Sequence, residues 1–230
     1  MRARHVATAV LALAGIVGGI AAAGPADARV RSVQAPARVV IAGPTTTIPA
    51  TVRVTARTPL GGYAASVWLG DLDAGRFVQV GAAAGDTRTL TVRARVPSVQ
   101  VRPGTSTLLA VDEGDGLAAA FTVDARRKSR ARLTHADPAG NGRVRLAARV
   151  THYSVAADRF VSSRLSPVRF QALRAGEWVT VAAATTTPDG LAGAIVSLPP
   201  GPATLRVVRL DGVTVWGATS RPLTVTVAAR

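Results

Sequence analysis

The chain has 230 residues, with 28 Lys and Arg against 13 Asp and Glu, and it contains no cysteine. The missing cysteine excludes disulfide frameworks, cysteine-based zinc sites and thiol nucleophiles. Val (32) and Thr (24) are abundant, whereas Glu occurs twice and Lys once, a balance that favours strands and argues against an all-helical fold.

The amino-terminal segment, residues 1–28, has the pattern of a secretory signal peptide. Arg2 and Arg4 precede an apolar stretch that ends at Ala23, and Ala26-Asp27-Ala28 forms an A-x-A cleavage site. The stretch is rich in Ala and Gly and ends in Gly-Pro, which argues against a transmembrane anchor. We therefore expect a secreted, extracellular product, residues 29–230, with no membrane span after cleavage.

Period-two alternation of apolar and polar residues recurs along the mature chain. In the segment 143–150, Val144, Leu146, Ala148 and Val150 alternate with polar or small residues and share one face of a predicted strand. The same alternation is found in Thr51–Arg57, Thr89–Val96, Pro167–Leu173 and Leu223–Val227. Turn residues separate these runs at roughly 8 to 12 residue spacing, which predicts antiparallel sandwiches or barrels.

An internal repeat divides the mature chain into two halves. Three segment pairs match in the same order, at offsets of 101, 97 and 102 residues: Gly75–Val80 with Gly176–Val181, Pro103–Leu108 with Pro200–Leu205, and Phe121–Val123 with Leu223–Val225. Two copies of a domain of about 100 residues fit this repeat, which is the size of an immunoglobulin-type sandwich. We predict domains at 29–125 and 133–230.

The segment 126–132 between them is a basic linker or a first strand. It contains five cations, and charge is distributed unevenly on its two sides. Residues 29–125 carry 10 Arg against 7 acidic residues, a net charge of +3, whereas residues 126–230 carry 16 Lys and Arg against 5 acidic residues, a net charge of +11.

The second half also resembles a known family. The segments Pro167-Val-Arg-Phe-Gln, Gly176-Glu-Trp-Val, Asp189-Gly190, Leu205-Arg-Val and Val215-Trp-Gly-Ala-Thr-Ser are similar to the bacterial immunoglobulin-like modules that occur, singly or in tandem, in secreted actinobacterial-type proteins. The resemblance covers about a third of the chain. It implies an all-β fold of two tandem immunoglobulin-like antiparallel β-sandwiches after the signal peptide, and it implies no particular activity.

Residues for catalysis or metal binding are scarce. The mature chain has two histidines, His135 and His152, whose spacing matches no zinc motif, and we expect His152 to be a half-buried strand residue with a satisfied ring nitrogen. Two acidic loops, 71–75 and 112–116, fit either calcium binding or ordinary turns. Trp178 fits either a sugar-stacking platform or a packing element matching Phe77. The sequence indicates no cofactor and no resident metal.

The cations of the second half form a candidate polyanion-binding set. Its members are Arg126, Arg127, Lys128, Arg130, Arg132, Arg143, Arg145 and Arg149. A solvated, solubilising face is the alternative interpretation, and the near absence of aromatic residues among these cations argues against sequence-specific nucleic-acid binding.

These observations favour a secreted, non-catalytic protein with a binding, adhesion or spacer role at the bacterial cell exterior. An envelope polymer or a cell-surface protein is the expected partner. Two alternatives remain: polyanion binding through the basic face of the second domain, and an enzyme whose site is dispersed through the sequence.

Overall fold

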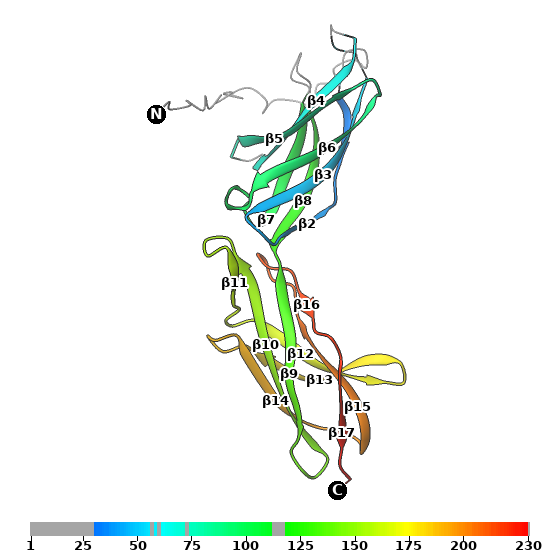
Figure 1. The fold of residues 1–230 in the computed structure, drawn as a ribbon, viewed down its shortest axis with the longest axis vertical. Helices are drawn as coiled ribbons and strands as arrows, with labels where there is room; N and C mark the ends of the chain where they lie inside the picture. The colour runs from blue at the N-terminus through cyan, green and yellow to red at the C-terminus, as the bar shows by residue number, and fades with distance from the viewer. Residues whose placement is uncertain (1–29, 56–57, 59–60, 72–73, 112–117, 230) are drawn as a thin grey trace.

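The computed structural model describes residues 30–55, 58, 61–71, 74–111 and 118–229 (Figure 1). Regular structure in this part of the chain consists of strands and one 3-10 turn, η1 (Ser98–Gln100). The predicted signal peptide lies outside the described residues. Within them, no helix has the length and apolar character needed to cross a bilayer.

The amino-terminal half forms a β-sandwich of two sheets. Its strands are β1 (Val30–Gln34), β2 (Arg38–Ile41), β3 (Thr45–Val54), β4 (Tyr63–Asp71), β5 (Arg76–Gly85), β6 (Thr89–Pro97), β7 (Gly104–Val111) and β8 (Ala118–Arg127). One sheet has the order β1-β3-β6 and the other β2-β8-β7-β4-β5. All pairs are antiparallel except β2 with β8, which run parallel.

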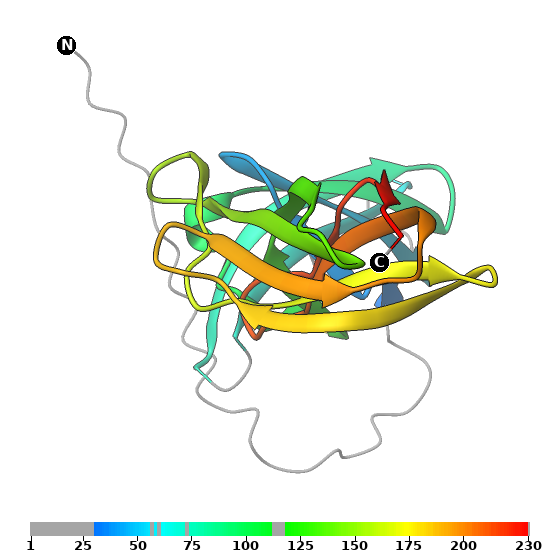
Figure 2. The ribbon, with the colours of Figure 1, turned by 90° about the horizontal axis from the view of Figure 1, so that it is seen from below.

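The carboxyl-terminal half forms a second β-sandwich. Its strands are β9 (Ser129–Pro138), β10 (Arg143–Ser154), β11 (Arg159–Ser162), β12 (Pro167–Arg174), β13 (Glu177–Thr185), β14 (Leu191–Ser197), β15 (Gly201–Arg209), β16 (Ala218–Thr219) and β17 (Leu223–Val227). One sheet joins β9, β10, β11 and β14, and the other has the order β13-β12-β15, with β16 and β17 both pairing with β15. Figure 2 views these layers from below and shows β17 ending near the carboxyl terminus.

The two sandwiches share one strand order. The short strands β2, β11 and β16 lie outside this shared order. In each sandwich, the first, second and fifth of the other strands form one sheet (β1-β3-β6 and β9-β10-β14). The remaining strands form the second sheet (β5-β4-β7-β8 and β13-β12-β15-β17). This is the division of strands A, B and E from C, F and G that defines the immunoglobulin-like sandwich. The predicted fold class, two tandem all-β sandwiches, is confirmed.

The matched segments of the sequence repeat lie on equivalent strands of the two sandwiches. The first pair leads into β5 and β13, the second into β7 and β15, and the third lies on β8 and β17. Gly104 and Gly201, which begin β7 and β15, have φ of +119° and +109°, a backbone conformation that a side chain disfavours. The repeat therefore preserves a backbone requirement as well as hydrophobic positions.

Alternation along the strands produces two hydrophobic cores. On β10, Val144, Leu146, Ala148 and Val150 are fully buried, whereas the arginines between them are exposed, as the pleat requires. The largest fully buried side chains of the first core are Ile41, Ile48 and Leu108, and those of the second are Phe170, Leu146 and Leu205. Small and β-branched residues fill most of both cores.

The junction between the sandwiches is short. Strand β8 ends at Arg127 and β9 begins at Ser129, so that Lys128 alone separates them. The Lys128 amide donates a hydrogen bond to the Ile41 carbonyl (2.8 Å), and the Lys128 carbonyl accepts one from the Tyr153 amide (2.8 Å). One residue therefore bonds to both sandwiches, which limits the rotation of one against the other.

A loop of the second sandwich, residues 210–217 between β15 and β16, docks on the first. Trp216 is 8% exposed, and its indole N–H donates to the Val39 carbonyl at 2.9 Å. Its ring lies between the guanidinium groups of Arg38 (3.9 Å) and Arg126 (4.3 Å). A parallel bridge between Arg127 and Val215 adds the loop to the end of β8.

Buried Arg209 holds the docking loop in shape from inside the second sandwich. Its Nη1 donates to the carbonyls of Leu210 (2.9 Å), Val215 (3.3 Å) and Trp216 (3.0 Å). Burial lowers the pKa of Arg209 from its ordinary value, and a guanidinium nevertheless stays charged at neutral pH. Three carbonyl groups thus replace part of the water that this cation loses, while its buried Nε has no hydrogen-bond partner among the described residues.

Replacement of Trp216 measures the strength of the junction. We expect Trp216→Phe to cost about 1 kcal/mol, because the Val39 carbonyl loses its donor, and Trp216→Ala to cost about 3 kcal/mol, because the ring is also lost. Chemical denaturation gives both values, and small-angle scattering of Trp216→Ala should show a wider range of inter-sandwich orientations. Unchanged scattering would contradict the assigned role of the loop.

Candidate polyanion-binding face

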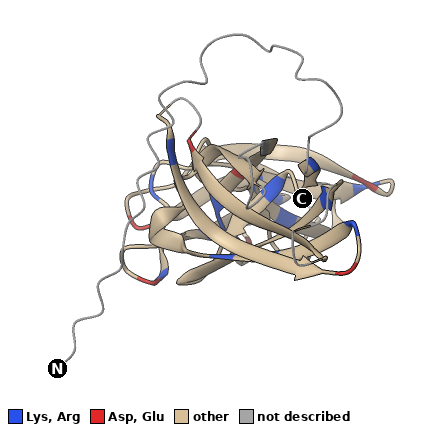
Figure 3. Cartoon of the chain, turned by 90° about the horizontal axis from the view of Figure 1, so that it is seen from above, with Lys and Arg blue, Asp and Glu red and all other residues tan. Residues whose placement is uncertain are grey.

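The structure separates the eight predicted cations into two groups. Arg126, Arg127 and Lys128 lie at the junction, and the other five lie on β9 and β10 of the second sandwich. Figure 3 shows Lys and Arg in blue and Asp and Glu in red on the ribbon. The two groups have different surroundings, and they are described separately.

Within the junction group, the side chain of Arg126 is engaged within the protein, whereas the buried Arg127 Nε has no hydrogen-bond partner among the described residues. Arg126 forms an ion pair with Asp124 (2.5 Å), donates to the Gly212 carbonyl (2.9 Å) and stacks on Trp216. The hydrogen bond to Asp124 is the main cause of a raised Arg126 pKa. Arg127 is half-buried, and Lys128 is exposed. Arg126 acts as part of the junction and is not available to a ligand in this arrangement.

The remaining five cations share one solvent-exposed sheet surface, which we call the arginine face. It consists of Arg130, Arg132, Arg143, Arg145 and Arg149. In the register of β9 with β10, Arg132 lies directly opposite Arg149, and Arg130 lies opposite Thr151. Residues directly opposite each other in an antiparallel pair project to the same side, so the pairing places all five on one surface.

Few acidic groups balance this charge. Asp137, opposite Arg145, is the one carboxylate that the register places on this surface of β9 and β10 among the described residues. Within the described part of the chain, Arg132, Arg143, Arg145 and Arg149 have no ion pair and no side-chain hydrogen bond. Arg130 stacks on Phe160, with its guanidinium carbon 3.6 Å from the ring centroid. Four guanidinium groups thus remain free to bind an anion.

Two exposed aliphatic residues border the arginine face. Leu191 and Ile195 on β14 are 47% and 52% exposed, and they lie opposite Arg149 and Arg145. Neither residue belongs to the set of cations predicted from the sequence, although both stand at alternating positions of a strand. The face therefore combines cations with apolar side chains.

Neither histidine forms a hydrogen bond with a Ser or Asp side chain among the described residues. His135 is exposed on β9. His152 is half-buried near the junction, and its neighbouring charges, Arg127 and Arg209, are cations. Its Nδ1 is buried and has no hydrogen-bond partner among the described residues. The expectation of a satisfied ring nitrogen was therefore wrong for Nδ1, because the strand end packs beside two arginines that offer donors only.

The tryptophans are engaged in packing and hydrogen bonding. Trp178 is partly buried, and the Arg206 guanidinium covers its ring at 4.0 Å from the centroid. A hydrogen bond from Arg206 Nε to Gln171 (2.8 Å) fixes that guanidinium in place. The Trp68 indole N–H donates to Ser66 (2.9 Å). A sugar that stacked on Trp178 would need an open face of the ring, and the Arg206 guanidinium covers a face of that ring here.

The two acidic loops considered for calcium lie largely outside the described residues. Residues 72–73 and 112–117 lie outside the described residues, and Asp71 Oδ1 accepts a turn hydrogen bond from the Ala74 amide. In the part of the chain that the structure describes, no group of three or more His, Cys, Asp or Glu residues is placed to hold a metal ion.

No family model and no curated protein matches this sequence. Among solved structures, a tetra-tandem repeat from the extending region of a large adhesion protein is similar at 18% identity and a TM-score of 0.33, covering 84% of this chain and 49% of its own. Salmonella alpha-2-macroglobulin reacted with methylamine is similar at 11% identity and a TM-score of 0.37, and the match covers 88% of this chain and 15% of that protein. Bovine butyrophilin is similar at 12% identity and a TM-score of 0.39, and the match covers 86% of this chain and 99% of that protein. The chain thus spans about half of the adhesion-protein repeat. The fold assignment rests on the strand order described above.

The charge arrangement predicts a stability change on removing one arginine. Like charges directly opposite each other on adjacent strands are destabilising, so Arg149→Thr should raise the free energy of unfolding by about 0.2–1 kcal/mol at low salt. The gain should disappear at 1 M salt, where screening is nearly complete at this distance. Urea denaturation at two salt concentrations checks this, and a loss of stability in Arg149→Thr at low salt would contradict it.

His152 predicts an acid sensitivity. Burial, followed by the charges of Arg127 and Arg209, lowers the His152 pKa from 6.5 in the folded chain. As the pH falls below 6.5, the unfolded chain binds more protons than the folded one, so the free energy of unfolding decreases. Denaturation between pH 7.5 and 5 should show this decrease, and His152→Gln should reduce it. An equal decrease in both proteins would assign the effect to other groups.

Proposed function

We propose that this chain is a non-catalytic binding protein of the bacterial cell exterior and that its second sandwich binds a linear polyanion through the arginine face. One observation carries the proposal: Arg132 and Arg149 lie directly opposite each other on an exposed surface, and Asp137, opposite Arg145, is the one carboxylate of that surface among the described residues of β9 and β10. A like-charge pair costs stability in the free protein. A polymer with closely spaced negative charges removes that cost.

The geometry of a sheet suits a polymer better than a small ion. Neighbouring strands lie about 4.8 Å apart, and alternate residues along a strand lie about 6.8 Å apart. On the arginine face, Arg132 and Arg149 lie one strand spacing apart, and the pairs Arg130–Arg132 and Arg143–Arg145 lie one alternate-residue spacing apart. Each guanidinium is a planar fork that matches a phosphate or carboxylate group. A chain of phosphate or carboxylate units therefore has several simultaneous partners.

We infer that the two sandwiches are separate domains, at residues 29–125 and 133–230, with the basic segment 126–132 shared between the end of β8 and the start of β9. The net charge of +3 on the first half and +11 on the second supports a division of roles. The first sandwich serves as a spacer or a contact for another surface molecule, and the second carries the polyanion site. Secretion through residues 1–28 places both outside the cell.

Retention on an anionic matrix tests the proposal. On a phosphocellulose column, residues 29–230 should bind at low salt and elute as the salt rises, because screening weakens the contacts. Arg143, Arg145 and Arg149 changed together to Gln should elute at a clearly lower salt concentration. Circular dichroism should show that the variant is folded, because all three side chains are exposed.

The chain offers a matched control on the equivalent sheet of the first sandwich. Arg53, Arg93 and Arg95 are exposed on β3 and β6, and changing them to Gln removes the same net charge. If retention depends on the arginine face, this control should elute close to the unmodified protein. Equal shifts in both triple variants would show that net charge alone causes retention and would refute the assigned face.

A further inference from the structure

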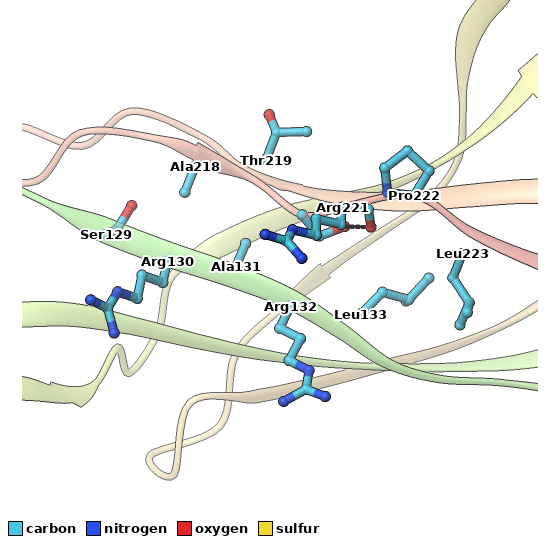
Figure 4. A pocket seen from close by; sticks show the side chains of 11 residues that line it. Ser129, Arg130, Ala131, Arg132, Leu133, Ala218, Thr219, Arg221, Pro222 and Leu223 are labelled. Carbon is cyan, nitrogen blue, oxygen red and sulfur yellow. Dashed lines mark hydrogen bonds between the residues drawn. The ribbon is translucent and has the colours of Figure 1, made fainter.

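A groove of about 690 Å³ runs along the outer edge of β9. It lies between residues 129–133 and the segment 218–223, which contains β16 and leads into β17 (Figure 4). Strand β9 pairs with β10 on one side only, and β17 pairs with β15 on one side only. Two sheet edges therefore meet at this groove without pairing with each other.

The backbone of β9 presents hydrogen-bonding groups to the groove. The Tyr153 amide donates to the Lys128 carbonyl, which fixes the phase of the β9–β10 ladder. Because bonded and non-bonded pairs alternate in an antiparallel ladder, Arg130 bonds to β10, whereas the N–H and C=O of Ser129 and Ala131 point away from it. Among the described residues, no strand pairs with β9 on that side. The groove thus offers the free side of a strand.

The side chains around the groove specify what an added strand would carry. Ala131 and Leu133 face inward toward the second core, and Leu223, 39% exposed, lies across from them. Arg130 and Arg132 project outward onto the arginine face between those inward positions. In Figure 4 their side chains point away from the 218–223 segment, whereas that of Arg221 lies between the segment and β9.

We propose that this groove binds an extended peptide strand that alternates apolar and acidic residues, added to the free edge of β9. Backbone hydrogen bonds to Ala131 give such a strand its register, as in other cases of strand addition to a sheet edge, whereas Ser129 is buried and its hydroxyl donates to the Trp216 carbonyl. Its apolar side chains face Leu223 and the core, and its acidic side chains lie beside Arg130 and Arg132 at cross-strand distance.

Charge opposes pairing of the β9 edges of two copies of this chain. The outward positions of β9 beside the groove are Arg130 and Arg132. Two β9 edges would therefore place these arginines beside each other. An exposed edge with such charges resists self-association while it remains open to an acidic strand.

The test uses a defined probe, the capped peptide acetyl-Ser-Glu-Val-Glu-Ile-Glu-Val-Ser-amide, with a scrambled peptide of the same composition that lacks alternation. Nuclear magnetic resonance titration of residues 29–230 should show saturable binding of the alternating peptide, with slowed amide exchange at Ala131. The scrambled peptide should bind at least about tenfold more weakly. Without alternation, it cannot place its acidic side chains beside the edge arginines while it places its apolar side chains toward the core.

Two variants examine the mechanism. Ala131→Pro removes the groove-facing N–H at an edge position where proline is tolerated, and it should weaken peptide binding roughly tenfold, whereas Ala131→Ser should not. Arg132→Glu should weaken binding of the acidic peptide and strengthen binding of the same peptide with Lys in place of Glu. This charge exchange keeps the test decisive if Ala131→Pro fails to fold.

The outcomes separate this proposal from polyanion binding by the arginine face. Changing Arg143 and Arg145 to Gln should leave peptide binding intact, and Ala131→Pro should leave phosphocellulose retention intact. Three results would overturn the proposal: no binding of the alternating peptide, equal binding of the scrambled peptide, or binding unchanged by both Ala131→Pro and Arg132→Glu. Any of them would leave polyanion binding by the arginine face to be judged by the phosphocellulose experiment alone.

Discussion

The pleat of the β-strand is the constraint on which the rest of this structure depends. A strand that buries one face exposes every second residue, and here Val, Leu and Ala fill the buried positions while Arg and Thr fill many of the exposed ones. The same alternation that builds two cores without disulfides therefore also arranges arginines in rows. On the sheet of β9 and β10, two such rows meet at Arg132 and Arg149. Fold and charge pattern have one origin.

The junction shows how a cation can be placed for structure instead of binding. Arg126 stands in the same basic segment as Arg130 and Arg132, yet it stacks on Trp216 and pairs with Asp124. Arg209 is buried and bonds to the carbonyls of the loop that carries this tryptophan. Because these contacts join β2 and β8 of one sandwich to a loop of the other, they set the direction in which the arginine face points relative to the first sandwich.

The all-β class, the internal repeat and the exposed arginines of β10 follow from sequence alone, because each depends on local periodicity or on a turn glycine such as Gly104. The roles of Arg126 and Trp216 do not, because they depend on contacts between residues far apart in the chain, for example Trp216 with Val39. Charge runs in a sequence do not distinguish a guanidinium that faces solvent from one that faces an aromatic ring. The missing partner of His152 Nδ1 is likewise a property of packing at the strand end.

The edge of β9 differs from its counterpart in the first sandwich in a way that bears on function. There the first strand is divided: β1 pairs with β3, and β2 crosses to pair in parallel with β8, whose outer edge it covers with Val39 and Ile41 buried beneath it. In the second sandwich β9 stays with β10 throughout its length, and no strand among the described residues covers the outer edge of β17. The two sandwiches therefore share a fold, but an added strand covers the outer edge of β8 and none covers the equivalent edge of β17 among the described residues. The open edge occurs in the half that also carries most of the positive charge, where like-charge repulsion keeps it from joining another copy of itself.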